Sequence, residues 1–365
     1  MLTWVEISAE NVEHNIRQFK KLIGEKKLLM PVIKSNAYGH GFFEIAKICV
    51  KNRGVDKLCV VSLDEAADLI KAKIKKPILI LSIFDLNDTK INLAIKNSVA
   101  FPLYTVEQAK KLNALGEGLG KKVTVHIKID TGAARVGFLP AEIPNLIKKL
   151  KKLKYVNIEG LWSHFASSET DEKFTSLQLD KMREAEKIFA LSGIKIPVKH
   201  MACSAAAGLF PNSHFNAIRL GLSLYGLYPA EALTKKIKLK PVLSWKTTII
   251  QIKNLPAGAK VGYGGSYITT KPTRLANLPV GYLDGYDRRL SNKAWVIIKG
   301  KKCPVRGRIC MNLMMVDVTE AAEAKTGDVA TLIGSEKNNK ITAENLAKIA
   351  GTINYEIVSR INPLI

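Results

Sequence analysis

The chain has 365 residues, and 56 Lys and Arg against 32 Asp and Glu give it a formal net charge of +24 at pH 7. This length suffices for two domains with a large core, and no run approaches the roughly 18 apolar residues that a membrane helix needs. The five cysteines show no metal-ligand spacing, and the N-terminus lacks the basic start and apolar stretch of a signal peptide. We therefore expect reduced thiols, a cytoplasmic location and no membrane partner.

The excess positive charge is spread along the whole chain. Its densest clusters, 148–154 and 235–240, interleave lysine with Ile and Leu at helical or strand spacing. Such clusters are typical of the solvated faces of amphipathic elements, and no ladder of aromatic residues accompanies them. We therefore expect no nucleic-acid partner, although a positive field favours anionic ligands such as a phosphate ester.

The first 230 residues alternate short apolar runs with amphipathic segments. After a helical pattern at 8–24, the runs predict strands at 28–33, 58–61, 78–81, 99–103, 123–129, 156–162, 198–203 and 217–224. The segments between them predict helices near 42–52, 64–74, 88–97, 106–115, 141–152, 172–192 and 205–210. Capping boxes mark two helix starts, Ser62 with Glu65 and Thr105 with Gln108. The alternation predicts an α/β fold that begins with a (β/α)8 TIM-type barrel.

The alternation of predicted strands and helices ends near residue 230. The remaining residues predict a mainly β C-terminal domain. Strands are expected at 241–255, 274–280, 294–298, 303–318 and 328–333, with one helix near 342–350. We therefore divide the chain into a barrel of residues 1–230 and a β domain of residues 231–365.

Polar side chains gather where the barrel strands end, which is where such barrels place their chemistry. They are Lys34, Lys128, Arg135, His164, Ser204, Arg219 and Tyr225. Lys34 ends an apolar run and precedes a loop with two glycines, which permit turns that other residues resist. Burial there would lower the lysine pKa, so that the amine can act as a nucleophile toward a carbonyl. A lysine that reaches from the strand end into solvent is the plain alternative.

Taken singly, the other residues also have structural explanations. His164 alone is most often a packed core residue, Arg219 could pair with a surface carboxylate, and Ser204 could cap a helix. His40 belongs to loop structure, because no second histidine lies at metal-ligand spacing. The glycines of 260–267 (KVGYGGSY) allow a tyrosine ring to approach another surface, although Gly-Tyr-Gly alone usually marks a turn.

The tract 30–41 (MPVIKSNAYGHG) resembles, almost residue for residue, the lysine motif that binds pyridoxal 5'-phosphate (PLP) in alanine racemases. Further motifs match the family in the same order along nearly the whole chain: KIDTGAARVG from Lys128, SHFA from Ser163, CSA from Cys203, RLGL from Arg219, KVGYGGSY from Lys260, GYLDG from Gly281, RICM from Arg308 and NYE from Asn354. The resemblance implies a PLP-dependent racemase of this family.

The resemblance also implies a role for each matched residue. Lys34 would hold PLP as a Schiff base and act on one face of the substrate Cα, and Tyr263 would act on the other face. The cofactor-binding set comprises Lys34, Tyr38, Arg135, His164, Ser204, Arg219, Gly221, Leu222 and Tyr355, and the substrate-binding set comprises Arg135 and Met311. No metal is implied. The family's tyrosine loop reaches the lysine of the other subunit, which implies a homodimer with shared active sites.

Some features depart from the family or vary within it. Asn312 follows Met311 where relatives commonly have Asp, and the stretch 287–289 (DRR) replaces a more usual Pro-Arg. The first departure replaces the acid by an uncharged amide. In some members the lysine that matches Lys128 is carbamylated.

Other functions stay open at this stage. A broad-specificity or serine racemase would share the scaffold, and related decarboxylases place a carboxylate where Arg219 lies. A non-catalytic PLP-carrying regulator would resemble the barrel alone and lack the tyrosine loop. The resemblance favours interconversion of L-alanine and D-alanine, supplying D-alanine for peptidoglycan. Tyr263 and Tyr355 would narrow the pocket to a small side chain.

Overall fold

The computed structural model describes residues 2–365, which pack into two compact units. The barrel unit comprises Glu10–Ala37 and Phe42–Lys240. The β unit comprises the residues up to Ala9, the short stretch Tyr38–Gly41 and the segment Pro241–Ile365. Each unit has its own core.

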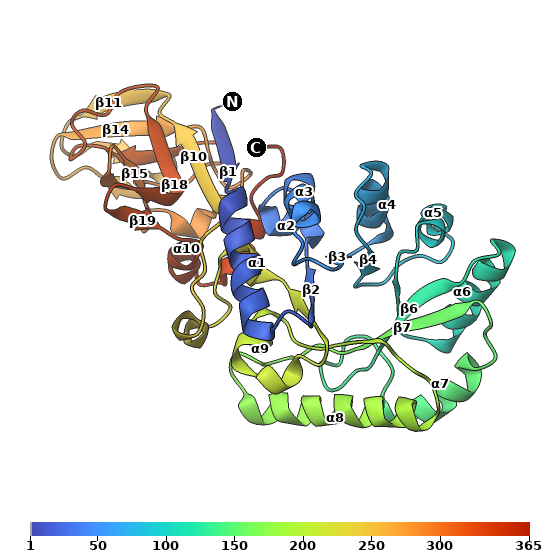
Figure 1. Cartoon of the computed structure of the whole chain (residues 1–365). Helices are drawn as coiled ribbons and strands as arrows, with labels where there is room; N and C mark the ends of the chain where they lie inside the picture. The colour runs from blue at the N-terminus through green and yellow to red at the C-terminus, as the bar shows by residue number, and fades with distance from the viewer. Residues whose placement is uncertain (1) are drawn as a thin grey trace. The chain divides into compact units, whose positions relative to one another are not determined.

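In the described part of the chain, the barrel unit is built on eight parallel strands (Figure 1). They are β2 (Leu28–Pro31), β3 (Leu58–Val60), β4 (Ile78–Ile80), β5 (Phe101–Leu103), β6 (Val123–Lys128), β7 (Val156–Trp162), β8 (Val198–His200) and β9 (Ala217–Leu220). One sheet has the order β2-β9-β8-β7-β6-β5, and β3 pairs with β4. Parallel bridges from Val32 to Cys59 and from Leu79 to Ala100 close the circle. The predicted barrel is confirmed.

Helices cover the outside of these strands (Figure 1). They are α1 (Ala9–Ile23), α3 (Phe42–Lys51), α4 (Leu63–Lys71), α5 (Lys90–Lys96), α6 (Val106–Gly118), α7 (Ile143–Leu150), α8 (Glu172–Leu191) and α9 (Ser204–Leu209). The short element α2 (Lys34–Gly39) instead follows the carboxyl end of β2 and is left-handed. Because both faces of the sheet are covered, β3, β4 and β5 are buried along their whole length. This explains why their sequences are continuous apolar runs.

The two predicted capping boxes are only half formed. The hydroxyls of Ser62 and Thr105 accept hydrogen bonds from the amides of Glu65 at 3.2 Å and Gln108 at 3.1 Å, as a cap requires. The side chains of Glu65 and Gln108 do not return to the cap residues. They accept from the amides one position earlier, at 2.7 and 2.9 Å, and so reach into the loops that follow β3 and β5.

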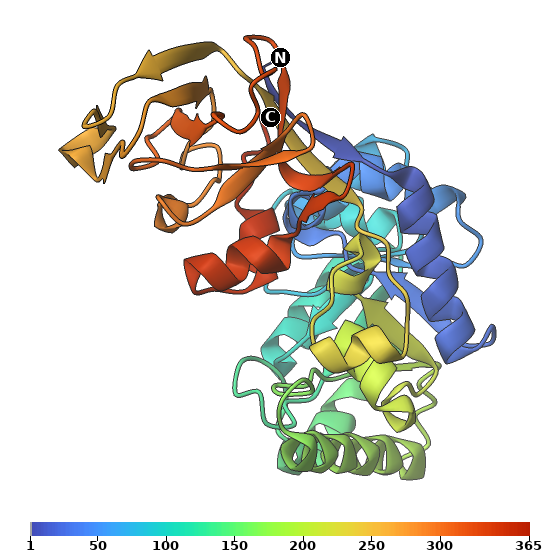
Figure 2. The ribbon, with the colours of Figure 1, turned by 90° about the vertical axis from the view of Figure 1, so that its left-hand side faces the viewer.

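The β unit is made of antiparallel sheets (Figure 2). Its strands are β1 (Thr3–Ile7), β10 (Leu243–Thr248), β11 (Gln251–Leu255), β12 (Lys260–Val261), β13 (Tyr267–Ile268), β14 (Thr273–Leu278), β15 (Trp295–Ile298), β16 (Lys301–Pro304), β17 (Met314–Asp317), β18 (Val329–Glu336) and β19 (Asn339–Ile341). The larger sheet has the order β1-β10-β18-β15-β16, with β19 on β18, and β11-β14-β17 form a second sheet. The helices are α10 (Ala343–Ala350) and α11 (Asn354–Ser359).

The first strand of the chain belongs to the β unit, which the sequence analysis missed. β1 pairs antiparallel with β10, so that Thr3 lies opposite Thr247 and their hydroxyls are 2.8 Å apart. The residues up to Ala9 therefore group with the C-terminal segment, whereas the predicted division assigned residues 1–230 to the barrel. Local hydrophobic pattern cannot show a pairing partner more than 200 residues away.

Two long predicted strands are each broken in the structure. The run 241–255 divides at Ile249 and Ile250 into β10 and β11, which lie in different sheets. The run 303–318 is not one strand, because the loop 305–313 separates β16 from β17. Gly307 lies in this loop with φ +78°, and a Cβ there would lie 2.8 Å from the carbonyl oxygen of Val261. The loop carries Met311.

Among the described residues, no helix combines the length and the apolar character needed to cross a membrane.

Candidate active site

Lys34 lies at the carboxyl end of β2, where the backbone turns in the left-handed sense. Residues 35–39 all have positive φ, between +50° and +85°. For residues other than glycine this conformation costs roughly 1–2 kcal/mol each. The turn is held by hydrogen bonds, among them Ala37 N–H to the Ile33 carbonyl at 3.0 Å and Phe42 N–H to the Asn36 side chain at 2.9 Å. The loop predicted after the strand is thus a strained left-handed turn.

The surroundings of Lys34 favour its neutral amine. Burial lowers the pKa of Lys34, the carboxylate of Glu65 opposes that change, and the charge of Arg135 adds to it. A lysine becomes a nucleophile or a base only when it loses its proton. The lowered pKa therefore fits the role expected for Lys34.

Arg219 is the third residue of β9, the strand beside β2 in the barrel sheet, and only 3% of it is exposed. Its guanidinium donates to the carbonyls of Ser163 at 2.8 Å and Met201 at 3.0 Å. It also lies 3.0 Å from Nδ1 of His164 and 2.5 Å from Nδ1 of His200. The alternative of a surface ion pair is wrong, because these partners are interior carbonyls and imidazoles.

A chain of hydrogen bonds continues from Arg219 through the barrel interior. Nε2 of His200 lies 2.8 Å from Nδ1 of His126, and Nε2 of His126 lies 2.6 Å from the carboxylate of Glu159, which also pairs with Lys57. An arginine only donates and a carboxylate only accepts. The two ends therefore fix the direction of the chain, with each histidine carrying its proton on Nε2.

The pKa values agree with this protonation. Burial lowers the pKa of His126 to about 4 and also lowers that of His200. Burial alone would raise the pKa of Glu159, but the hydrogen bond from His126 and the charge of Lys57 lower it to about 2. Gly160 leaves the space that this arrangement needs, because a Cβ at that position would overlap the His126 ring. At neutral pH the imidazoles are neutral and the carboxylate is ionised.

The Trp162 ring is in contact with three polar side chains. Nζ of Lys128 lies 4.5 Å from the centre of the Trp162 ring, and the guanidinium carbon of Arg219 lies 5.0 Å from it. The His200 ring stacks on the same indole, with centroids 5.6 Å apart and an interplanar angle of 13°. Burial and the nearby charges of Arg135 and Arg219 lower the pKa of Lys128 to about 8.

Arg135 is exposed on the loop that follows β6. The carboxylate of Asp130 shapes this loop by accepting from the backbone amides of Gly132 at 2.9 Å, Ala134 at 3.2 Å and Arg135 at 3.0 Å. Backbone hydrogen bonds of this kind lower the pKa of Asp130, although burial opposes them. The loop is therefore ordered by an ionised aspartate.

Ser204 is the first residue of α9 and does not cap it, because Cys203 occupies the cap position. Its hydroxyl accepts from the backbone amides of Gly221 at 3.0 Å and Ser223 at 3.3 Å. The alternative of a capping serine is therefore wrong. Ser204 instead ties the start of α9 to the turn after β9 that contains Leu222.

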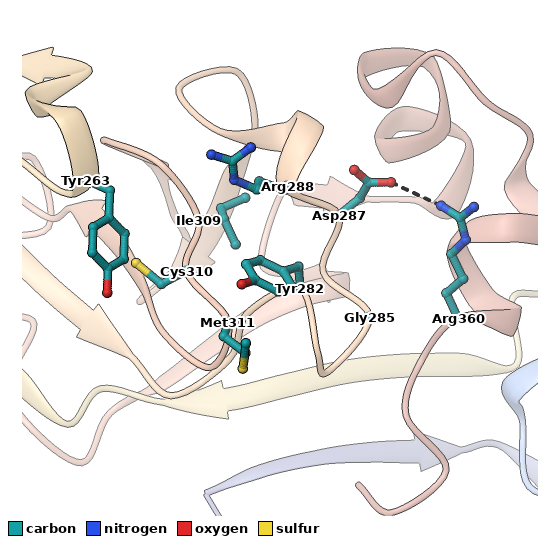
Figure 3. A pocket seen from close by; sticks show the side chains of 9 residues that line it. All are labelled: Tyr263, Tyr282, Gly285, Asp287, Arg288, Ile309, Cys310, Met311 and Arg360. Atoms are coloured by element: carbon teal, nitrogen blue, oxygen red, sulfur yellow. Dashed lines mark hydrogen bonds and ion pairs between the residues drawn. The ribbon is translucent and has the colours of Figure 1, made fainter.

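Tyr263 lies on a short turn of the β unit, and 68% of it is exposed. Gly262, Gly264 and Gly265 surround it with φ of +69°, +70° and +53°, a conformation that L side chains rarely adopt. The tyrosine borders a pocket of about 1050 Å³ (Figure 3). Its lining residues are Tyr263, Tyr282, Gly285, Asp287, Arg288, Ile309, Cys310, Met311 and Arg360. In Figure 3 the Tyr263 ring lies beside Cys310.

Two further tyrosines of the β unit lie together. The rings of Tyr38 and Tyr355 have centroids 6.1 Å apart at an angle of 45°. Tyr355 lies on α11, and Tyr38 belongs to the left-handed turn that follows Lys34. A Cβ at Gly39 would overlap the carbonyl of Val358 on the same helix, so this close approach requires glycine.

Comparison with known proteins shows which family the chain belongs to. The family description "Alanine racemase, N-terminal domain" matches residues 7–229, and "Alanine racemase, C-terminal domain" matches residues 242–365. The chain belongs to the alanine racemase family. An alanine racemase of Methanococcus maripaludis is 38% identical over 362 residues, which cover 98% of this chain and 96% of the relative. This family consists of amino-acid racemases, a class of isomerases.

Solved structures of the family have the same fold. Alanine racemase of Clostridium difficile superimposes with a TM-score of 0.93 at 36% identity, covering 99% of this chain and 94% of the other. The alanine racemase of Bacillus anthracis with bound L-Ala-P gives a TM-score of 0.91 at 32% identity, with coverage of 99% and 93%.

The structure divides the family-matched residues between its two units. The barrel unit holds Lys34, Arg135, His164, Ser204, Arg219, Gly221 and Leu222, and the β unit holds Tyr38, Tyr263, Met311 and Tyr355. In the barrel unit, His164 contacts Arg219, and Ser204 contacts Gly221. Met311 is 52% exposed in the Tyr263 pocket, and its carbonyl accepts from the amide of Leu283 at 3.0 Å.

Sequence reasoning missed the chain behind Arg219. Its members are His126, His200, Glu159 and Lys57. The signal was present, because a histidine interrupts each of the apolar runs 123–129 and 198–203. A polar residue in a buried strand usually has a hydrogen-bond partner. Two histidines in buried strands of one barrel therefore predict a hydrogen bond between them.

Proposed function

We propose that this protein is an alanine racemase that interconverts L-alanine and D-alanine with PLP as cofactor. The observation that carries the proposal is the buried Arg219 on β9, beside β2, the strand that leads to Lys34. A permanent cation there, held by carbonyls and neutral imidazoles, supports racemisation, because the related decarboxylases place a carboxylate at that position. The family membership of the whole chain supports the same reaction.

The residues of the barrel unit suit PLP. An anionic phosphate ester with a reactive aldehyde calls for an uncharged amine and several hydrogen-bond donors. Lys34, with its lowered pKa, would hold the aldehyde, and Arg219 would donate to the ring nitrogen. Ser204 and the turn at Gly221 and Leu222 would hold the phosphate.

Four more residues complete the proposed binding set. Tyr38 and Tyr355, which lie together, would contact the phosphate. Arg135 would bond the phenolic oxygen of PLP and approach the substrate carboxylate, and His164 would hold Arg219. When bound, PLP withdraws electrons from the substrate Cα and so makes its proton acidic.

Two side chains would move the protons. Inversion at Cα requires that one proton leave one face and that another arrive at the opposite face. The Lys34 amine would serve the face from which D-alanine loses its proton, and the Tyr263 phenol would serve the face of L-alanine. The exposure of Tyr263 in its unit leaves the phenol accessible to such a partner.

Arg219 would limit side reactions. A guanidinium stays protonated, so Arg219 donates a hydrogen bond without handing over its proton. Arg219 would therefore leave the ring nitrogen of PLP unprotonated and would suppress transamination. The chain through His200 and His126 to Glu159 would keep the guanidinium in this orientation.

We further propose a homodimer in which Lys34 of one subunit and Tyr263 of its partner share a site, as the family resemblance implies. Tyr263 and Tyr355 would favour a small side chain. The B. anthracis relative was solved with L-Ala-P, which supports an alanine-sized substrate. We expect a cytoplasmic enzyme that supplies D-alanine for peptidoglycan.

The direct test is to incubate the purified protein with added PLP and L-alanine, and to measure D-alanine. L-serine and L-lysine are assayed in parallel, together with carbon dioxide release. D-alanine formation well above D-serine and D-lysine formation supports the proposal. Comparable rates with all three amino acids would indicate a broad-specificity racemase, and carbon dioxide without D-alanine would indicate a decarboxylase.

A further inference from the structure

Glu65 joins the ends of two barrel strands. Its Oε1 accepts a hydrogen bond from the Ser35 amide at 2.6 Å, and its Oε2 accepts one from the Val61 amide at 2.7 Å. Ser35 directly follows Lys34 at the end of β2, and Val61 directly follows β3. One carboxylate on the first turn of α4 therefore fixes the backbone beside the lysine.

This contact goes beyond the needs of the helix cap. Gln108 occupies the same position on α6 and accepts from the Tyr104 amide through its one oxygen, at 2.9 Å. Glu65 makes the equivalent bond to Val61 and uses its second oxygen for Ser35. An amide at position 65 has a single acceptor oxygen and would turn its NH2 group toward one of the two N–H donors.

The backbone that Glu65 holds is strained. Ser35 has φ +54°, and Asn36 and Ala37 continue the left-handed turn at +53° and +50°. Such conformations persist only where the surrounding structure over-determines them. Although Ser35 is exposed, its hydrogen bond to Glu65 anchors the turn on the side toward α4.

Glu65 also balances the charges that surround Lys34. The groups that face the lysine are Glu65 on α4, Arg135 on the loop after β6 and His164 after β7. Burial lowers the pKa of Lys34, the Glu65 carboxylate raises it, and Arg135 lowers it. Glu65 is thus the anion that opposes both burial and the cationic neighbour.

We propose that Glu65 is a positioning residue for Lys34: its carboxylate locks the left-handed turn that carries the amine and supplies an anion beside that turn. The inference rests on the proposed function of Lys34 in binding the cofactor. Neither measurement that tests it depends on alanine turnover, so a protein without racemase activity would leave the inference about Glu65 testable.

The test compares full-length wild type with Glu65→Gln, Glu65→Asp and Ser62→Ala. Hydrogen exchange at the Ser35 amide is measured on the protein as purified. The pH midpoint of Lys34 acetylation by acetic anhydride is measured by mass spectrometry after hydroxylamine and dialysis have removed bound carbonyl ligands. Ser62→Ala is the matched control, because it removes the α4 cap and leaves the carboxylate unchanged.

Glu65→Gln is expected to speed Ser35 exchange at least about tenfold and to move the Lys34 midpoint to lower pH, because the anion that favours the ammonium is gone. Glu65→Asp keeps the charge but is one methylene shorter, so exchange should quicken while the midpoint stays near wild type. Ser62→Ala should leave both near wild type. The inference is overturned if Glu65→Gln behaves like Ser62→Ala in either measurement.

Discussion

Nδ1 of His200 lies 2.5 Å from a guanidinium nitrogen of Arg219, and both side chains are buried. Because the arginine can only donate, His200 must accept on Nδ1 and carry its proton on Nε2. That proton points to His126, which in turn donates to Glu159. The negative charge of Glu159 therefore determines the orientation of the arginine through two neutral rings.

Glu159→Gln is expected to weaken the barrel and the hold on Arg219. The glutamine amide is neutral, so Lys57 loses its counter-charge. Because an amide can also donate, the direction of the hydrogen bonds along the chain is no longer fixed. Since Glu159 is partly exposed, we expect the free energy of unfolding to fall by about 2 kcal/mol, with a lower kcat for alanine. Urea unfolding and steady-state kinetics measure the two effects.

Glu186→Gln is the matched control for this prediction. Glu186 is about as exposed as Glu159 and pairs with Lys199 at 2.5 Å on the same unit, but Lys199 is 30% exposed, whereas the partners of Glu159 are buried, Lys57 at 10% and His126 at 0%. Such a surface pair contributes roughly 0–1 kcal/mol. Equal losses of unfolding free energy in the two variants would show that the hydrogen-bond chain behind Arg219 contributes no more than a surface ion pair.

Acid should destabilise the protein well above the pH at which its carboxylates titrate. Burial lowers the pKa of His126 from an ordinary 6.5 to about 4. Between pH 6.5 and 4 the unfolded chain therefore binds a proton at His126, whereas the folded barrel does not. The stabilisation is complete above pH 6.5 and is lost as pH falls toward 4. For His126 alone the loss at pH 5 is about 2 kcal/mol.

Glu159 acts in the same direction at lower pH, because its pKa of about 2 lies below the ordinary value of 4.5. Its contribution is present above pH 4.5 and disappears as pH falls toward 2. Denaturant unfolding at pH 7, 6 and 5 measures the histidine part. A free energy of unfolding that stays constant over this range would disagree with neutral, buried imidazoles.

Gly160→Ala should disrupt the same chain by sterics. The added methyl group would overlap the His126 ring, and crowding of a packed core costs about 1–3 kcal/mol. Gly118→Ala is the control, because a Cβ at Gly118 meets nothing within 4 Å at the end of α6. It should be neutral or stabilise by up to about 1 kcal/mol. Thermal unfolding that ranks the two variants in the opposite order would refute the steric explanation.

Lys128 is expected to form a carbamate. Its pKa of about 8 leaves part of the amine neutral near pH 7.5, and a neutral amine adds to carbon dioxide with release of a proton. The new anion would face the positive charges of Arg135 and Arg219, which favours it. Carbon-13 bicarbonate should give a carbamate signal in the NMR spectrum that Lys128→Ala lacks. Identical spectra of the two proteins would exclude the modification.

The barrel could be predicted from sequence because its strands are continuous apolar runs. Each of them ends near a residue that interrupts the pattern, as Lys34 ends the first run. The contiguous motif from Met30 to Gly41 also located the lysine from sequence alone. Its left-handed backbone could not be predicted, since Ser35, Asn36 and Ala37 are not glycines and nothing local signals positive φ.

Pairings between residues far apart in the chain were the other feature that could not be predicted from sequence. The β1–β10 pair joins residues more than 230 positions apart, and the bond from Glu65 to Ser35 crosses between neighbouring strands. A capping-box pattern predicted where α4 begins, but it assigned the Glu65 side chain to the wrong amide. Local patterns therefore predicted the elements, and tertiary packing decided which polar groups meet.

The proposed reaction depends above all on one pairing, in which the amine of Lys34 and the phenol of Tyr263 serve one site, each from a different subunit. Lys34→Ala and Tyr263→Ala proteins are each prepared alone, unfolded together, refolded and assayed for D-alanine formation from L-alanine. Random pairing makes about half of the dimers mixed, each with one intact site, so the mixture should regain about a quarter of wild-type activity. Activity that stays at the level of the separate variants, with mixed dimers shown to be present, would contradict the shared site.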